Sequence, residues 1–159
     1  MAELSLYPVV IEPSWIDYNG HVRDAYYTLM VSYATDQVMD QLGLDATYRQ
    51  HTRCTLYTLE LHIHYLRELK ADDAVVVRSL LLGADKKRLH VACRVEAARL
   101  GPEAAATAEF MCLHVQQGET VRVCNFPETV LERVRHYSAG PEAAARFAPA
   151  SRQIALKRG

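Results

Sequence analysis

The stretch WIDYNGHVRDAYYTLMVSYATDQVMDQLG, residues 15–43, decides the fold, because the period of the sequence changes within it. Residues 14–20, around the beginning of this stretch, are rich in residue types that favour turns. After the turn, apolar residues recur at steps of three and four, as they do on one face of a helix: Val22, Tyr26, Leu29, Tyr33, Val38, Met39 and Leu42. Gly43 then follows as a C-cap. The pattern predicts a turn and then one helix of about five to six turns.

Most of the remaining core is predicted to lie in strands. Runs of alternating or continuous apolar residues, separated by short polar turns, indicate strands at residues 6–12, 54–66, 74–82, 88–98, 104–116 and 120–124. Within residues 54–66, one predicted face carries Leu59, Leu61, Ile63 and Tyr65, and the other carries Thr58, Glu60, His62 and His64. A further helix is expected from Pro127, with Val130, Leu131 and Val134 on its buried face.

One apolar helix and one half-apolar sheet can bury each other if the sheet curls around the helix. We therefore expect an α+β fold, a curled antiparallel sheet around one long central helix; an unrelated α+β sandwich is the alternative. Residues 1–140 are expected to form the domain, and the alanine-rich residues 141–159 an extension that is surface-packed or disordered. Exposed sheet edges favour a homodimer or homotetramer.

The composition of the sequence argues against some classes of binding partner. The formal charge of the 159 residues is −1, which argues against broad binding to nucleic acid or to an anionic membrane. No apolar run approaches the ~20 residues of a membrane span. The four cysteines show no CxxC spacing, and each lies in an apolar, strand-like run, where a cysteine usually behaves as a small buried apolar residue. A cytoplasmic location is expected.

The turn before the long helix carries the candidate chemistry. Asp17 lies a few residues upstream of the helix start, where unpaired N–H groups and the helix dipole favour negative charge. A carbonyl oxygen bound there would be polarised as in an oxyanion hole, and a nearby carboxylate is placed to attack it or to activate water. Gly20 permits close approach of a ligand to the backbone. The alternative is that Asp17 only caps the turn or the helix.

The pattern Asp17-x-x-Gly20-His21-Val22, followed by a helix with Tyr27 one turn in, resembles the 4-hydroxybenzoyl-CoA thioesterase-like hotdog family. The resemblance implies that Asp17 is the catalytic carboxylate, as nucleophile or general base. It also implies that backbone amides at the helix start bind the thioester oxygen; these amides belong to Arg23, Asp24 and Ala25. The sequence departs from the family at Arg23-Asp24, where many members carry two asparagines.

Longer strings resemble one group in this family, the betainyl-CoA thioesterases of carnitine breakdown. The strings are Trp15-x-Asp17-Tyr18-Asn19-Gly20-His21, Glu60-x-His62-Ile63, Leu66-Arg67-Glu68, Gly83-Ala84-Asp85-x-Lys87-Arg88-Leu89-His90, and Ala106-Thr107-Ala108-Glu109 leading to Leu113-His114-Val115. The resemblance implies hydrolysis of betainyl-CoA to betaine and CoA, without a metal or prosthetic group; CoA belongs to the substrate. The alternatives are another short acyl-CoA, an acyl-carrier-protein substrate, or a non-catalytic acyl-CoA-binding module.

A betainyl group carries a trimethylammonium, which aromatic faces and a carboxylate can hold. Candidate aromatic residues are Trp15, Tyr18, Tyr26, Tyr57 and Tyr65, and Glu60 is the candidate carboxylate. Each tyrosine has the alternative role of a core residue with a solvated hydroxyl. The remaining substrate-site candidates are neighbours of the motif or of Glu60: Asn19, His21, Tyr27 and His62.

Two other signals concern anions and metals. Lys86, Lys87 and Arg88 form a dense basic run at a predicted turn, which either binds the phosphates of CoA or is an ordinary solvated turn. His62 and His64 share one strand face, but no HExxH pattern accompanies them, so no metal site is expected. The GxSxG elbow of serine hydrolases is also absent from the sequence.

Overall fold

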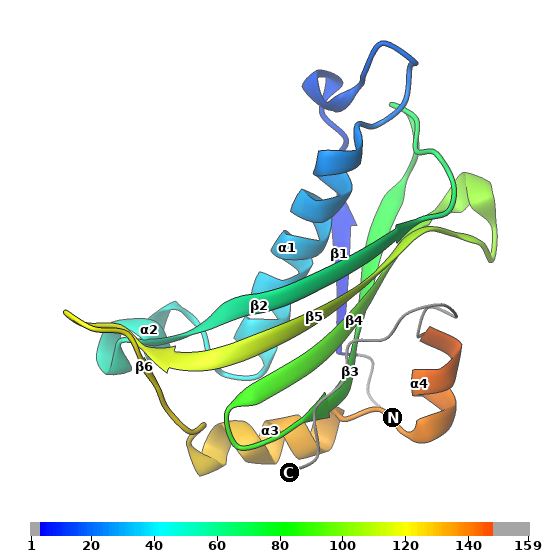
Figure 1. Cartoon of the computed structure of the whole chain (residues 1–159). Coiled ribbons are helices and arrows are strands. Elements are labelled where there is room, and N and C mark those ends of the chain that lie inside the picture. Colours follow the sequence, from blue (N-terminus) through cyan, green and yellow to red (C-terminus); the bar gives the residue numbers. More distant parts are fainter. Residues whose placement is uncertain (1–3, 148–159) are drawn as a thin grey trace.

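The computed structural model describes residues 4–147. Its strands form one six-stranded antiparallel sheet in the order β1-β3-β4-β5-β2, and β6 pairs with the end of β5 (Figure 1). The longer elements, in chain order, are β1 (Ser5–Val9), α1 (Asp24–Gln41), α2 (Ala46–Thr52), β2 (Cys54–Tyr65), β3 (Val75–Ala84), β4 (Arg88–Ala97), β5 (Ala104–Gln116), β6 (Arg122–Val123), α3 (Glu128–Tyr137) and α4 (Pro141–Phe147).

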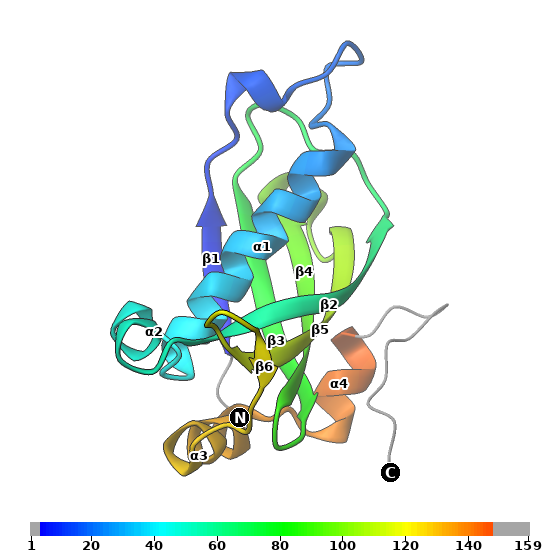
Figure 2. The same cartoon turned by 60° about the vertical axis from the view of Figure 1, so that its left-hand side comes forward.

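The sheet curls around α1, which lies along its concave side (Figure 2). The buried face of α1 carries Tyr27, Met30, Val31, Ala34, Thr35, Val38 and Met39. The facing side chains of the sheet in the same core include Val77, Val91, Val95 and Phe110. Each fully buried aliphatic side chain contributes about 1.5–3 kcal/mol to folding. The predicted α+β hotdog architecture, a curled antiparallel sheet around one long central helix, is confirmed.

The ends of α1 follow local rules. At its C-terminus the N–H groups of Gly43 and Leu44 donate to the carbonyls of Asp40 and Met39, at 3.0 and 2.8 Å, and Gly43 has a φ of 81°. This is a Schellman cap, and it confirms the role predicted for Gly43. At the other end, the helix begins two residues later than the pattern predicted, because Val22 forms a β-bridge with Ile16.

The first predicted strand is also shorter than expected. It ends at Val9, and the chain then forms a short 3₁₀ turn at Pro13–Trp15. Tyr33, placed by its spacing on the apolar stripe of the helix, is 45% exposed and packs its ring beside that of Tyr7. The buried apolar face of α1 is therefore narrower than predicted at Tyr33, where the helix faces the edge strand β1.

The alternation predicted for β2 is interrupted by a bulge between Thr58 and Glu60. Leu61 and Ile63 pack against the core, as expected, whereas Leu59 is 56% exposed. An extra residue in one strand shifts all following side chains by one position relative to the partner strand. Leu59 is therefore not on the buried face predicted for it.

The C-terminal part packs outside the sheet. Pro127 caps α3, which buries Val130 and Val134 as predicted. Helix α4 contacts β3 and β4, and the Arg94 guanidinium lies 6.0 Å from the Phe147 ring centroid. The expected extension, residues 141–159, begins with α4, and residues 148–159 lie outside the described residues. Within residues 4–147, no helix combines the length and the apolar character needed to cross a bilayer.

Candidate active site

Asp17 lies in a tight turn that its own side chain organises. Its Oδ1 accepts hydrogen bonds from the backbone N–H groups of Asn19, at 2.8 Å, and His21, at 3.3 Å. The backbone closes the same turn, because Asp17 N–H donates to the His21 carbonyl at 2.8 Å and Gly20 N–H donates to the Asp17 carbonyl at 3.0 Å. Gly20 has a φ of 78°, a conformation that glycine adopts without strain. His21 thus braces the turn through its backbone N–H and carbonyl groups.

The Asp17 carboxylate keeps its charge readily. The hydrogen bond from Asn19 N–H is the main cause that lowers its pKa below the ordinary aspartate value, with His21 N–H and the charge of Arg23 adding to the effect. One carboxylate oxygen is therefore held by the turn, and the group is ionised at neutral pH. An ionised, solvent-accessible carboxylate is the species that a nucleophile or general base requires.

The start of α1 supplies backbone donors beside this carboxylate. The N–H groups of the first helical turn have no carbonyl of a preceding turn to bind. Arg23 N–H is an exception, because it donates to the Trp15 carbonyl at 2.9 Å and is not available to a ligand. This corrects the expectation that the Arg23 amide is an oxyanion donor. Asp24 and Ala25 remain as candidates, although the Asp24 Oδ1 atom accepts from Ala25 N–H at 2.9 Å.

An open hollow of about 390 Å³ joins Asp17 to the helix start and to the segment after β2. Its walls are formed by Asp17, His21, Val22, Asp24, Tyr27, Tyr65, Leu66, Arg67 and Glu68. The structure thus brings together five of the residues predicted for the site: Asp17, His21, Asp24, Tyr27 and Tyr65. The charged residues of the lining are three acids (Asp17, Asp24 and Glu68) and one arginine, Arg67, whose guanidinium pairs with Glu103 at 2.8 Å.

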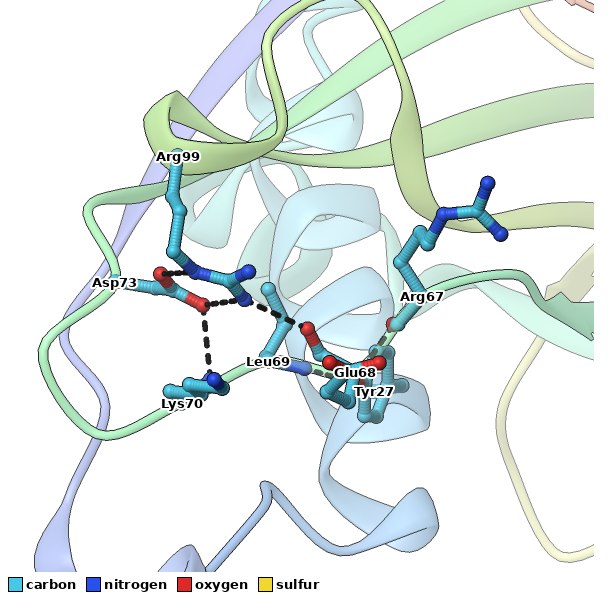
Figure 3. A network of polar contacts seen from close by, with 7 residues as sticks. All are labelled: Tyr27, Arg67, Glu68, Leu69, Lys70, Asp73 and Arg99. Atoms are coloured by element: carbon cyan, nitrogen blue, oxygen red, sulfur yellow. Dashed lines mark hydrogen bonds and ion pairs between the residues drawn. The ribbon is translucent and has the colours of Figure 1, made fainter.

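Tyr27 connects α1 to the wall formed by residues 66–70 (Figure 3). Its hydroxyl accepts from the N–H of the buried Leu69 at 2.8 Å and donates to the Arg67 carbonyl at 3.3 Å. Its ring contacts the Tyr65 ring edge-on, with centroids 5.4 Å apart. Burial is the main cause that raises the pKa of Tyr27. Tyr27 therefore positions the wall of the hollow through a neutral hydroxyl.

A second anchor holds the same segment from the other side. The Arg99 guanidinium binds both carboxylate oxygens of Asp73, at 2.7 and 2.9 Å, and donates to the Glu68 carbonyl at 2.9 Å (Figure 3). The N–H of Lys70 also donates to Asp73, at 2.8 Å. Residues 67–70 are thus fixed on both sides, which presents Glu68 to the hollow.

No sequence pattern singles out Arg67 and Glu68 as site residues, apart from their place in the string Leu66-Arg67-Glu68. Both residues belong to the segment that connects β2 to β3, and this segment crosses over the start of α1. The crossing is held where Val22 N–H donates to the Leu69 carbonyl at 2.8 Å. The pKa of Glu68 is lowered, mainly by its own backbone N–H and further by the charges of His21 and Lys70. Glu68 is therefore a second ionised carboxylate beside Asp17.

The other aromatic candidates near the motif lie differently. Trp15 is buried and stacks on Tyr26, with centroids 5.0 Å apart and an interplanar angle of 11°. Trp15 lines a separate hollow of about 230 Å³ beside β1, together with Tyr33. Tyr18 is 91% exposed, and Asn19 beside it is exposed as well. In this chain, none of these four predicted residues (Trp15, Tyr18, Asn19, Tyr26) lines the described hollow around Asp17.

The candidates on β2 spread along the strand. Tyr65 is at the end beside Asp24, to whose carbonyl its hydroxyl donates at 3.3 Å. Glu60 and His62 lie farther along the strand, and His62 pairs across it with Glu109. Tyr57 accepts a hydrogen bond from Gln117 at 3.2 Å, and eight residues of strand, roughly 26 Å, separate it from Tyr65. Within one chain, Tyr57, Glu60 and His62 are therefore not brought to Asp17.

The basic run is at the opposite end of the molecule. Lys86 and Lys87 form the turn between β3 and β4, and Arg88 begins β4. Asp85 accepts from the N–H groups of Lys87 and Arg88 and pairs with the Arg88 guanidinium at 2.6 Å. β3 has ten residues and is about 33 Å long, so this turn and the Asp17 turn are at opposite ends of the sheet (Figure 1).

Comparison with known proteins agrees with the fold and the motif. Residues 11–134 match the family described as the thioesterase-like superfamily. A betainyl-CoA thioesterase of Pseudomonas aeruginosa is 44% identical over 131 residues, which cover 82% of this chain and 81% of the relative. The class of protein that the curled sheet and the Asp17 motif define is thus that of the hotdog thioesterases.

Two solved structures resemble the chain over nearly its whole length. A Pseudomonas putida protein proposed to be a thioesterase is 39% identical, with a TM-score of 0.78 and 99% of each chain covered. A hypothetical protein of Staphylococcus aureus, solved in complex with CoA, has a TM-score of 0.83 at 28% identity, with 98% of each chain covered. The chain belongs to the thioesterase-like superfamily, and the predicted class, a hydrolase of acyl-CoA thioesters, is confirmed.

Proposed function

We propose that this protein hydrolyses betainyl-CoA to betaine and CoA. The observation that carries the choice of substrate is the composition of the hollow around Asp17. Three acidic residues and two tyrosines line it, and its one arginine, Arg67, pairs with Glu103, which lies outside the lining. A trimethylammonium has no N–H to donate, so aromatic faces and negative charge are what can attract it. The naming of a 44% identical relative as a betainyl-CoA thioesterase supports the same substrate.

The chemistry follows from Asp17 and the start of α1. With Asp17 as general base, it takes a proton from water while the oxygen attacks the thioester carbonyl; with Asp17 as nucleophile, it forms an anhydride that water then opens. In both routes the C–S bond breaks, and the sulfur leaves as CoA thiolate and takes up a proton. The Asp24 N–H group is the proposed donor to the negative oxygen, an interaction worth about 10²–10³ in rate. The Ala25 N–H group can join it only when the Asp24 carboxylate releases it.

We also propose that the working unit is a homodimer or a larger homo-oligomer. β2 is an edge strand, and its end carries the exposed Tyr65 and Leu66. CoA carries several phosphates, whereas the hollow around Asp17 has an excess of carboxylates. The basic turn Lys86–Arg88 is too far from Asp17 within one chain, so a second copy is the natural source of it. Other short acyl-CoA substrates, or an acyl-carrier protein, are the remaining alternatives.

The first experiment is a thiol-release assay over a panel of acyl-CoA substrates with wild-type protein and Asp17→Asn. We expect betainyl-CoA to give the highest kcat/KM, and the variant to lose about 10²–10⁴ in kcat. The substituted amide oxygen can still accept from Asn19 N–H, so the turn should persist, which circular dichroism and thermal unfolding can check. Full activity of Asp17→Asn, or no CoA release from any substrate, would contradict the proposal.

A further inference from the structure

Two cysteines and a histidine from three separate segments meet at the end of the sheet far from Asp17. Cys54 begins β2, His114 is near the end of β5, and Cys124 follows β6. The two Sγ atoms are 3.8 Å apart, and Cys124 Sγ is 3.3 Å from His114 Nδ1. The three ligand atoms all lie within 4.8 Å of one another, and this is the only such group of three among residues 4–147.

These separations fit the edges of a zinc coordination tetrahedron. With Zn–S bonds of about 2.3 Å and Zn–N bonds of about 2.05 Å, tetrahedral angles place two sulfurs about 3.8 Å apart and a sulfur and a nitrogen about 3.6 Å apart. The remaining edge, between Cys54 and His114, is at most 4.8 Å long, so its closure to about 3.6 Å requires a shift of at most about 1.2 Å. A disulfide would need the two sulfurs to approach to about 2.05 Å.

The surroundings of His114 also suit a metal ligand. Tyr48 Oη lies 3.0 Å from His114 Nε2, and His114 Nδ1 lies 3.1 Å from the Cys124 carbonyl oxygen. Metal binding at Nδ1 therefore replaces the contact with that carbonyl and moves the ring proton to Nε2, which donates to Tyr48. Metal-bound histidines usually donate their second N–H to such a group, which fixes the ring orientation. The ring is also held by Phe126, with centroids 4.6 Å apart. His114 is 1% exposed, so its orientation is set by packing before any ion binds.

We propose that Cys54, His114 and Cys124 bind one Zn²⁺ ion, or a similar thiophilic divalent cation. Binding transfers the two thiol protons to solvent and leaves two thiolates and one neutral imidazole as ligands. Cys124 is partly exposed, so water can complete the tetrahedron. The ion would join the start of β2 to the segment after β6, 70 residues later. Cys54 is at the opposite end of β2 from Tyr65, the residue beside Asp24, so the ion takes no part in thioester hydrolysis at Asp17.

The test uses the full chain, reduced and then freed of metal with a chelator. Titration with Co²⁺ should show one equivalent bound, with a thiolate-to-cobalt charge-transfer band that added Zn²⁺ removes. Cys54→Ala and Cys124→Ala should each weaken Co²⁺ binding at least a hundredfold. Cys93→Ala is the matched control, since Cys93 is also a buried cysteine but lies outside the cluster; this variant should bind as wild type does.

Native mass spectrometry of the wild-type chain with Zn²⁺ gives a second measurement that needs no variant. We expect one added zinc ion and a higher melting temperature, with no change in thioesterase activity when a chelator removes the ion. Absence of stoichiometric binding, or an unchanged charge-transfer band in Cys124→Ala, would overturn the proposal. So would a Cys54–Cys124 disulfide formed in dilute peroxide by a wild-type chain that binds no Co²⁺, because that result identifies a redox pair.

Discussion

Asp17 has two roles in this site. Its side chain organises the turn, and the same side chain is the proposed reactive group, although a carboxylate engaged in hydrogen bonds is less free to react. The conflict is resolved because its Oδ1 atom accepts both backbone N–H groups. The same hydrogen bonds that define the turn lower the pKa of the carboxyl group, so the residue that caps the turn is also the one kept ionised. The capping and catalytic interpretations of Asp17 therefore describe one geometry.

The pKa of Asp17 leads to a prediction about pH. Its ionised form is the active one in both proposed routes, and a lowered pKa means that this form persists as the pH falls through the usual carboxyl range. We expect the acid limb of kcat/KM for betainyl-CoA to lie below about pH 4. The measurement is a pH–rate profile, with circular dichroism at each pH to show that the chain stays folded. An acid limb between pH 6 and 7 would show that a different group controls the rate.

Glu68 provides the test of substrate recognition. Glu68→Gln keeps the size of the side chain and removes one negative charge from the hollow. We expect kcat/KM to fall about tenfold more for betainyl-CoA than for acetyl-CoA, since a contact with the trimethylammonium of about 1–2 kcal/mol is lost. Glu60→Gln is the comparison, because Glu60 is the carboxylate that the sequence predicted for the cation, and within one chain it lies outside the hollow. Equal losses on both substrates for Glu68→Gln would contradict the assignment to Glu68, and a selective loss for Glu60→Gln would assign the cation to Glu60 instead.

At the scale of elements, the crossing of the β2–β3 connection over the start of α1 builds the site. Tyr27→Phe removes the hydroxyl that binds the buried Leu69 N–H, and leaving that donor unpaired costs about 1–3 kcal/mol. We expect a melting temperature lower by several degrees and a lower kcat/KM, because the wall carrying Glu68 loosens.

Tyr65→Phe is the matched comparison for stability. The Tyr65 hydroxyl makes one 3.3 Å bond to the Asp24 carbonyl at an exposed position, where water can replace it. Differential scanning calorimetry should therefore show a smaller shift for Tyr65→Phe than for Tyr27→Phe. Equal shifts would mean that the Tyr27 hydroxyl does not anchor residues 67–70.

The sequence predicted those elements whose signals are local. The three- and four-residue period of α1, the Gly43 cap and the Asp17 turn all depend on neighbouring residues, and the long strands were placed to within a few residues. The bulge at β2 was not predictable, because it depends on the register with β5. The hydrogen bond that engages Arg23 N–H depends on where Trp15 folds back, which no local pattern indicates.

Contacts between distant segments were missed for the same reason. Treated one at a time, Cys54 and Cys124 look like ordinary apolar positions, and only the pairing of β2 with β5 and of β5 with β6 brings them together. Glu68 likewise reaches the hollow through tertiary contacts made by Tyr27 and Arg99. The sequence was sufficient to propose the reactive carboxylate, but not the residues that surround it.

For the whole molecule, the position of the basic turn is the main constraint on any account of CoA binding. The turn between β3 and β4, which carries Lys86–Arg88, and the segment before α1, which carries Asp17, lie at opposite ends of the sheet (Figure 1). The length of β3, about 33 Å, separates them. If this turn binds the phosphates of CoA, it must do so at the site of a second copy. Replacement of Lys86, Lys87 and Arg88 by glutamate should then raise KM with little change in kcat.

Complementation between two inactive variants tests this arrangement. One variant carries Asp17→Asn, and the other carries the three charge reversals at Lys86–Arg88. In a mixed dimer with shared sites, one site combines an intact Asp17 from one copy with an intact basic turn from the other. Co-expression with two purification tags isolates that dimer. We expect about half the wild-type activity at low betainyl-CoA concentration, whereas each parent homodimer stays far below it. Activity no higher than the mean of the two parents would place the basic turn outside the CoA site.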